Sequence, residues 1–114
     1  MKIAIYGPEF NERSQSAIIQ LSEYLSKKSA RVFVEENFYQ SILEQSTIEI
    51  DRYGFETFKT LDSTFDLLIS VGGDGTILRA ITHVKDLDIP IVGINTGRLG
   101  FLATIKRDDI VGAL

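Results

Sequence analysis

The chain has 114 residues, enough for one domain with one hydrophobic core, which at this size buries roughly two-thirds of its extended surface. Hydrophobic residues make up 44% and charged residues 25%, so the composition excludes a disordered chain, and no apolar run approaches the ~20 residues that cross a bilayer. The net charge of −4 argues against a nucleic-acid partner. The lack of cysteine excludes disulfides and thiolate metal sites and favours a cytoplasmic location.

The first part of the chain alternates strand and helix patterns. Lys2–Tyr6 is mostly apolar and ends at the Gly7-Pro8 turn, which predicts a short strand. Arg31–Glu35 has the β-branched and aromatic content of a second strand. Between them, residues 14–29 carry apolar side chains at helical spacing on one face, which predicts an amphipathic helix packed on a sheet. These apolar positions are Ala17, Ile18, Leu21, Tyr24 and Leu25.

The middle of the chain has a less regular pattern. Residues 37–44 predict a short helix, whereas residues 45–64 fit a strand, a loop or a second small helix, and the sequence leaves that choice open. The aromatic residues of this stretch indicate core or interface packing and not a stacking platform; they are Tyr53, Phe55 and Phe58. Glu35 and Glu36 indicate the end of a strand more than a metal site.

Two buried strands follow, each ending in a glycine turn. Residues 66–71 are apolar on both faces, as in the interior of a parallel sheet, and residues 89–95 repeat this character. The first turn contains Gly72, Gly73 and Gly75, and the second covers residues 97–100. Between the two strands, apolar residues at helical spacing predict a helix. They are Ile77, Leu78, Ile81 and Val84.

The order of these elements predicts the fold class. Strands alternate with helices along the chain, which is the pattern of an α/β domain with a parallel sheet. We therefore expect residues 1–114 to form one domain, a Rossmann-like parallel sheet with helices on both faces. Near the end of the chain, Asp108 fits the N-cap of a further helix. Because no C-cap or polar tail follows, we expect a fragment or an early-terminated chain of something longer.

The sequence GGDGT at residues 72–76 indicates a ligand site. Glycines let backbone amides approach phosphate oxygens, and the N-terminus of the following helix adds partial positive charge, so the turn is suited to anions. An aspartate repels phosphate, so Asp74 suits a hydroxyl group held beside the phosphates. Thr76 suits either the cap of the helix or a hydrogen bond to a phosphate. The chain lacks a G-x-x-x-x-G-K-[ST] loop, and its first turn lacks G-x-G-x-x-G.

A structural explanation exists for any pair of these glycines, because such pairs are ordinary turn residues. The whole pentapeptide, however, is expected by chance only on the order of 10⁻⁴ times in a chain of this length. It also follows a predicted strand, and open parallel sheets bind ligands beyond the carboxyl ends of their strands. If the strands at 66–71 and 89–95 are neighbours, the two glycine turns face the same crevice.

GGDGT, together with NTGRLGFL at residues 95–102, resembles the ATP-NAD kinase family, whose members phosphorylate the 2′-hydroxyl of the adenosine ribose of NAD to make NADP. The first motif is shared with diacylglycerol-type lipid kinases and phosphofructokinases, and the second narrows the resemblance to NAD kinase. The opening strand and helix agree with it, so the resemblance covers the N-terminal domain of that family. The family's second, mainly β domain has no counterpart in this chain.

The resemblance implies a role for each matching residue. Asp74 corresponds to the general base that accepts the ribose hydroxyl proton. The NAD-binding positions that it implies are Asp74, Gly75, Arg79, Asn95, Leu99, Gly100 and Phe101, with Gly97 in the same loop. The positions implied for the ATP phosphates are Gly72, Gly73, Gly75 and Thr76. From the residues alone, Arg79 fits a solvated helix position equally well, Phe101 fits a core position equally well, and His83 fits the surface of a helix.

The resemblance implies an ATP-dependent phosphotransferase, with Mg²⁺ accompanying ATP, NAD as the second substrate, and no metal site built by the protein. A carboxylate at a helix N-terminus is a weak base, so Asp74 orients the hydroxyl more than it deprotonates it. We expect a homo-oligomer without nucleic-acid or membrane partners. Because half of the active site is unmatched, we expect little or no activity from the 114-residue chain alone.

Two other classes of function stay open at this point. A lipid kinase domain shares the first motif, but NTGRLGF has no counterpart there and no basic amphipathic surface is evident. A non-catalytic nucleotide-binding or assembly module would need neither a second domain nor a completed active site. Formation of NADP separates the kinase from both alternatives.

Overall fold

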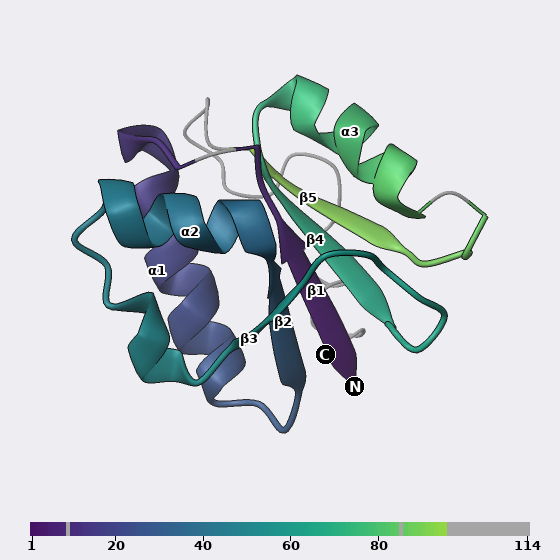
Figure 1. Cartoon of the computed structure of the whole chain (residues 1–114), viewed down its shortest axis with the longest axis horizontal. Helices are drawn as coiled ribbons and strands as arrows, with labels where there is room; N and C mark the ends of the chain where they lie inside the picture. The colour runs from purple at the N-terminus through teal and green to yellow at the C-terminus, as the bar shows by residue number, and fades with distance from the viewer. Residues whose placement is uncertain (9, 85, 96–114) are drawn as a thin grey trace.

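Five parallel strands form one sheet in the computed structural model, which describes residues 1–8, 10–84 and 86–95 (Figure 1). The strands are β1 (Lys2–Tyr6), β2 (Arg31–Glu35), β3 (Glu56–Phe58), β4 (Leu67–Gly72) and β5 (Ile91–Asn95). The helices in these ranges are α1 (Glu12–Ser26), α2 (Glu36–Gln45), the 3₁₀ helix η1 (Ile50–Tyr53) and α3 (Asp74–Val84). The predicted α/β class is confirmed, whereas the helix predicted after Asp108 lies outside the described residues.

The strand order is β3-β2-β1-β4-β5, so the direction of the chain across the sheet reverses at β1. Ile3 of β1 lies opposite Val32 of β2 on one side and Leu67 of β4 on the other. Because crossover connections are right-handed, the reversal places α1 and α2 on one face of the sheet and α3 on the opposite face (Figure 1). The boundary between β1 and β4 is therefore a topological switch point.

Each face of the sheet has its own hydrophobic core. Successive side chains of a strand point to opposite faces, so alternate residues of β1 and β4 enter different cores. Under α1 and α2 the buried cluster includes Ile3, Ile5, Ala17, Ile18, Leu25, Phe38, Ile42, Leu67, Ile69 and Val71. Under α3 it includes Ala4, Tyr6, Phe58, Leu61, Phe65, Leu68, Ala80, Val84 and Ile89. Burial of β4 on both faces agrees with its uniformly apolar sequence.

Helix α1 begins at Glu12, two residues before the predicted start. Asn11 accepts a hydrogen bond from the Ser14 amide at 3.1 Å, and the Ser14 hydroxyl accepts one from the Asn11 amide at 3.2 Å. This capping box satisfies two backbone donors that the first turn leaves unpaired, which fixes the start of the helix. The helix ends at Ser26 and not at residue 29, because Lys27 occupies the C-cap.

Residues 45–64, for which the sequence left a strand, a loop or a small helix open, contain both a small helix and a strand. These are the 3₁₀ helix η1 and the short strand β3. Gly54 ends η1 in the left-handed conformation, with φ of 70°. The rings of Tyr53 and Phe55 stack with centroids 5.5 Å apart, and Phe58 is buried. The predicted core packing of these three aromatic residues is confirmed.

Of the apolar residues whose spacing predicted α3, Val84 faces the sheet, whereas Leu78 and Ile81 do not. Leu78 and Ile81 are 68% and 49% exposed, whereas Ala80 and Val84 are buried. Thr76, one turn before Ala80, is also buried and continues the inward stripe. Small side chains at 76 and 80 let the helix lie close to the sheet, which turns the two larger residues outward.

Strand β5 begins at Ile91, two residues after the predicted start. Asp88 has a positive φ of 57°, and Pro90 has no amide hydrogen for the ladder. The Pro90 carbonyl still accepts a hydrogen bond from the Leu68 amide at 2.9 Å. Among the described residues, no helix combines the length and the apolar character that a bilayer crossing requires.

Candidate functional site

The candidate site lies at the carboxyl edge of the sheet, next to the switch point. All five strands are parallel, so all of them end at this edge. Its central strands end at Tyr6 in β1 and Gly72 in β4, and β5 ends at Asn95. The carboxyl ends of these strands converge where α3 begins (Figure 1). In doubly wound sheets this is where ligands bind.

The glycine turn separates into two pairs of residues with different environments. Gly72 is buried and has a φ of 158°, and a Cβ atom placed on it would clash with Thr76 Oγ1. Thr76 is only 5% exposed. Gly73 and Gly75 are exposed, and a Cβ atom on either would meet nothing within 4 Å. Gly72 and Thr76 therefore shape the turn, whereas Gly73 and Gly75 leave open space for a ligand.

Helix α3 begins with Asp74, one residue before the predicted start near Gly75. Thr76 thus lies inside the first turn of α3 and is not its N-cap. The interpretation of Thr76 as the cap of the helix is therefore wrong. The Thr76 amide donates to the Gly73 carbonyl at 3.0 Å and closes the turn. The backbone of Asp74 stands at the positive end of the helix, where amides without intrahelical partners attract anions.

Asn95 is the residue of the second motif that lies within the described part of the chain. Strands β4 and β5 are neighbours, and Asn95 lies opposite Gly72 in the register of the two strands. Strand neighbours are about 4.8 Å apart, so the start of the second motif adjoins the first. Gly97, Leu99, Gly100 and Phe101 lie outside the described residues.

Arg79 and His83 are on the flank of α3 that faces β1. The rings of His83 and Tyr6 lie with centroids 4.5 Å apart, which joins the last turn of α3 to the end of β1. His83 lies on the helix surface, as expected, but is half-buried because of this contact. Arg79 is exposed and lies one helical turn closer to the glycines on the same flank.

Tyr6 was not singled out by the sequence, although it is the last residue of a strand at the ligand-binding edge. Burial raises the pKa of Tyr6 above its ordinary value of 10.0; the positive charge of Arg79 opposes this rise in pKa, and the negative charge of Glu35 adds to it. The phenol therefore stays protonated at neutral pH and can donate a hydrogen bond. A polar-tipped aromatic residue directly before a Gly-Pro turn is the signal that would have drawn attention to it.

Glu35 is the last residue of β2, and its carboxylate binds backbone amides of the next helix. It is buried, and its two carboxylate oxygens accept hydrogen bonds from the amides of Asn37 at 2.9 Å and Phe38 at 3.1 Å. It thus caps α2, in agreement with the predicted strand end. Across residues 1–8, 10–84 and 86–95, no three His, Cys, Asp or Glu residues are grouped as a metal site would need.

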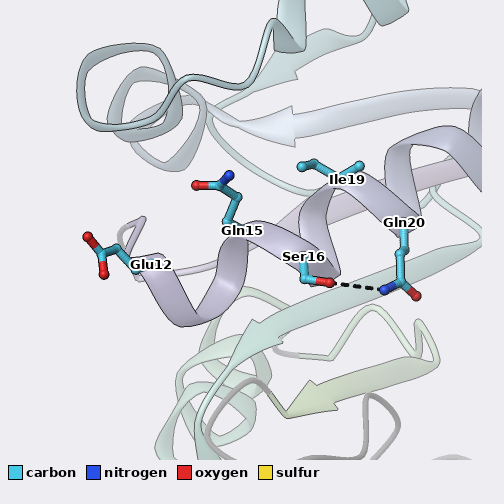
Figure 2. A pocket seen from close by; sticks show the side chains of 5 residues that line it. All are labelled: Glu12, Gln15, Ser16, Ile19 and Gln20. Carbon is cyan, nitrogen blue, oxygen red and sulfur yellow. Dashed lines mark hydrogen bonds between the residues drawn. The ribbon is translucent and has the colours of Figure 1, made fainter.

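A hollow of about 520 Å³ lies along α1, on the face of the sheet opposite α3 (Figure 2). The residues that line it are Glu12, Gln15, Ser16, Ile19 and Gln20, all from one helix. Gln20 Nε2 donates a hydrogen bond to Ser16 Oγ at 3.0 Å, one turn back along the helix (Figure 2). The lining has one carboxylate and no cation, so it does not suit a phosphate, and the glycine turn is the better candidate.

Comparison with known proteins gives consistent matches. The profile described as "ATP-NAD kinase N-terminal domain" matches residues 5–114. A NAD kinase of Christiangramia forsetii is 48% identical over 114 residues, which are 100% of this chain and 39% of that protein. A NAD kinase of Flavobacterium psychrophilum is 44% identical over 110 residues, 96% of this chain and 37% of that protein. The chain therefore spans less than two-fifths of the length of these relatives.

A solved structure shares the fold. The crystal structure of yeast NADH kinase complexed with NADH superimposes with a TM-score of 0.62 and covers 98% of this chain and 34% of that chain. Sequence identity between the two is 21%, so this likeness concerns the fold.

Proposed function

This chain belongs to the ATP-NAD kinase family, whose N-terminal domain it matches over residues 5–114, and on that premise we propose that it provides part of a site in which ATP phosphorylates NAD. The 2′-hydroxyl oxygen of the adenosine ribose would form a bond to the γ-phosphorus of ATP. The bond between that phosphorus and the β,γ-bridging oxygen would break, so that NADP and ADP leave and the hydroxyl proton is released.

One observation carries this proposal. Asp74 is the first residue of α3, between two exposed glycines, at the carboxyl edge beside the switch point. The amides of an open turn and a helix N-terminus suit phosphate oxygens, and a carboxylate beside them suits a hydroxyl that must be oriented and lose its proton. Phosphoryl transfer proceeds through a loose transition state, so correct positioning accounts for most of the rate.

The roles of the individual residues follow the resemblance. We propose that Asp74 orients the ribose hydroxyl and accepts its proton, and that Gly73 and Gly75 present their amides to the ATP phosphates. Buried Gly72 and the buried side chain of Thr76 would hold this turn in shape without contacting the phosphates. The proposed NAD contacts are Gly75 and Asn95, with Leu99, Gly100 and Phe101.

Mg²⁺ would arrive as part of the ATP substrate. This ion keeps several waters and binds through phosphates and one or two carboxylates, so it needs no cage made only by the protein. Its chemistry at this site would be to neutralise the charge of the transferred phosphoryl group. A cytoplasmic location and a homo-oligomeric state are further proposals, and sedimentation equilibrium measures the latter.

The test is the formation of NADP from NAD, ATP and Mg²⁺ by the intact gene product. We expect Asp74→Asn to lower kcat by about 10²- to 10⁴-fold, the usual contribution of an acid-base residue. Asp51→Asn, the same change at an exposed position in η1, should leave kcat unchanged. A wild type that forms no NADP contradicts the proposed reaction, and near-normal kcat in Asp74→Asn contradicts the role of this residue.

The 114-residue chain is assayed in parallel. Because it spans 39% of the length of the C. forsetii relative, we expect little NADP formation from it and weak binding of NAD in a calorimetric titration. Wild-type-like NAD affinity in the short chain would contradict this expectation. Nucleotide binding without NADP formation by the intact gene product would instead support the non-catalytic alternative.

A further inference from the structure

We propose that Tyr6, Arg79 and His83 form the subsite for the phosphate chain of the phosphoryl donor, on the β1 side of the glycine turn and separate from the subsite of NAD on the β5 side. This inference rests on the proposed function and assigns the two substrates to opposite sides of β4. It moves Arg79 from the NAD contacts that the family resemblance implied to the contacts of the donor.

The topology of the sheet places the two substrates on different sides of the glycine turn. Strand β4 carries the glycine turn and has β1 on one side and β5 on the other. Asn95, the described residue of the second motif, ends β5 and lies opposite Gly72. Tyr6 ends β1 and lies opposite Ser70. A ligand that contacts Asn95 and one that contacts Tyr6 thus approach the turn from different sides.

Helix α3 presents Arg79 and His83 on its β1 side. Thr76, Ala80 and Val84 face the sheet, and His83 packs against the ring of Tyr6, so this flank of α3 faces β1. Arg79 precedes His83 by four residues and shares its flank. Arg79 consequently stands on the side away from Asn95, between the His83–Tyr6 contact and the glycine turn.

The charge of this surface also suits a phosphate chain. Arg79 takes part in none of the ion pairs that link the described residues, which join Lys2 to Asp62, Arg31 to Glu56 and Lys59 to Glu36. The nearby carboxylate of Glu35 is engaged by the amides at the start of α2. A guanidinium without an ion-pair partner among the described residues, beside a phenol donor and an imidazole, is suited to the oxygens of a phosphoanhydride chain.

A buried serine on the same side supports a ligand there. Ser70 lies opposite Tyr6 and is 1% exposed, and its hydroxyl has no hydrogen-bond partner among the described residues. Side chains alternate along β4, so Ser70 shares the α3 face with Leu68 and with Tyr6 of the neighbouring strand. Leaving such a hydroxyl unpaired is costly, and an ordered water beneath a bound phosphate chain would pair it.

The phosphate chain could belong to ATP or to inorganic polyphosphate, because both present the same linked phosphate groups. The direct test is calorimetric titration of the intact gene product with Mg-ATP, tripolyphosphate, AMP and NAD. We expect Arg79→Gln to weaken binding of ATP and tripolyphosphate at least tenfold and to change binding of AMP and NAD less than twofold. Loss of ATP binding with retained tripolyphosphate binding would identify a nucleotide-specific contact, and overturn the shared-chain assignment.

Two further variants sharpen the test. Tyr6→Phe removes the donor hydroxyl but keeps the ring against His83. It should weaken the binding of ATP and of tripolyphosphate by about threefold and leave the binding of NAD unchanged. Arg52→Gln makes the same charge change at an exposed position of η1, on the opposite face, and should alter none of the four affinities. The proposal is overturned if Arg79→Gln weakens the binding of NAD but not that of ATP. It is also overturned if Arg79→Gln and Arg52→Gln have the same affinities for all four ligands.

Kinetics separate this inference from the proposed function. In the intact gene product, Arg79→Gln should raise KM for ATP at least tenfold and leave KM for NAD within twofold. If the wild type makes no NADP, the proposed reaction fails, and the binding titrations alone decide the subsite. If the wild type binds neither ATP nor tripolyphosphate, the subsite proposal fails whatever the reaction.

Discussion

At the scale of single residues, the contact between Gly72 and Thr76 explains why the turn needs a glycine at this position. The Thr76 side chain occupies the space that a Cβ atom on Gly72 would require. The neighbouring Gly73 has open space and no such constraint. The pentapeptide therefore combines a residue selected by packing with residues suited to an approaching ligand, a distinction that the sequence does not contain.

Gly72→Ala and Gly73→Ala form a matched pair that tests this distinction. The new methyl group in Gly72→Ala clashes with buried Thr76, and we expect a loss of about 1–3 kcal/mol in the free energy of unfolding, the usual cost of overpacking. Gly73→Ala should stay within about 0.5 kcal/mol of the wild type. Urea denaturation followed by circular dichroism measures both values, and equal losses in the two variants would refute the packing explanation.

At the scale of elements, the start of α1 depends on a capping box that the apolar spacing did not locate. Asn11 and Ser14 exchange hydrogen bonds at the first turn. Helical periodicity identifies a helix by its buried face, but the ends are decided by which side chains pair the free amides. The same reasoning applies to α2, whose unusual cap is the buried carboxylate of Glu35.

Asn11→Ala should lower the free energy of unfolding by about 1 kcal/mol, because it removes the acceptor for the Ser14 amide. Asn37→Ala, the same substitution at an exposed position of α2, should change it by no more than about 0.5 kcal/mol. Thermal or urea unfolding compares the two variants. A loss in Asn37→Ala as large as that in Asn11→Ala would mean that the cap is not responsible.

At the scale of the whole molecule, two tyrosines on opposite faces of the sheet link stability to pH. Burial raises the pKa of Tyr6, and burial together with the hydrogen bond to Glu23, 2.9 Å away, raises the pKa of Tyr53. A raised pKa means that the folded state holds the phenol proton more tightly than the unfolded state. The resulting stabilisation is complete below the unfolded pKa near 10.0 and is lost as pH rises through the folded pKa.

The free energy of unfolding should therefore fall more steeply above about pH 10 in the wild type than in Tyr6→Phe/Tyr53→Phe. Lysine side chains also lose protons in this range, and the difference between wild type and double variant removes their contribution. Urea denaturation at a series of pH values between about 8 and 11 measures the free energy of unfolding. We expect the values for the two proteins to diverge from about pH 10 upward. Parallel curves for the two proteins would contradict the expectation.

Patterns among neighbouring residues are enough to predict most of the helices and strands and to locate the candidate site. Strand and helix periods, the glycine turns and the GGDGT and NTGRLGFL motifs are properties of neighbouring residues, so they predicted the α/β class and the family. The strand order is a property of the folded chain, and it places β1 and β5 on opposite sides of β4. Folding also brings Arg79 and His83 to the side of Tyr6, because contacts between residues far apart in the chain depend on packing that no local pattern records.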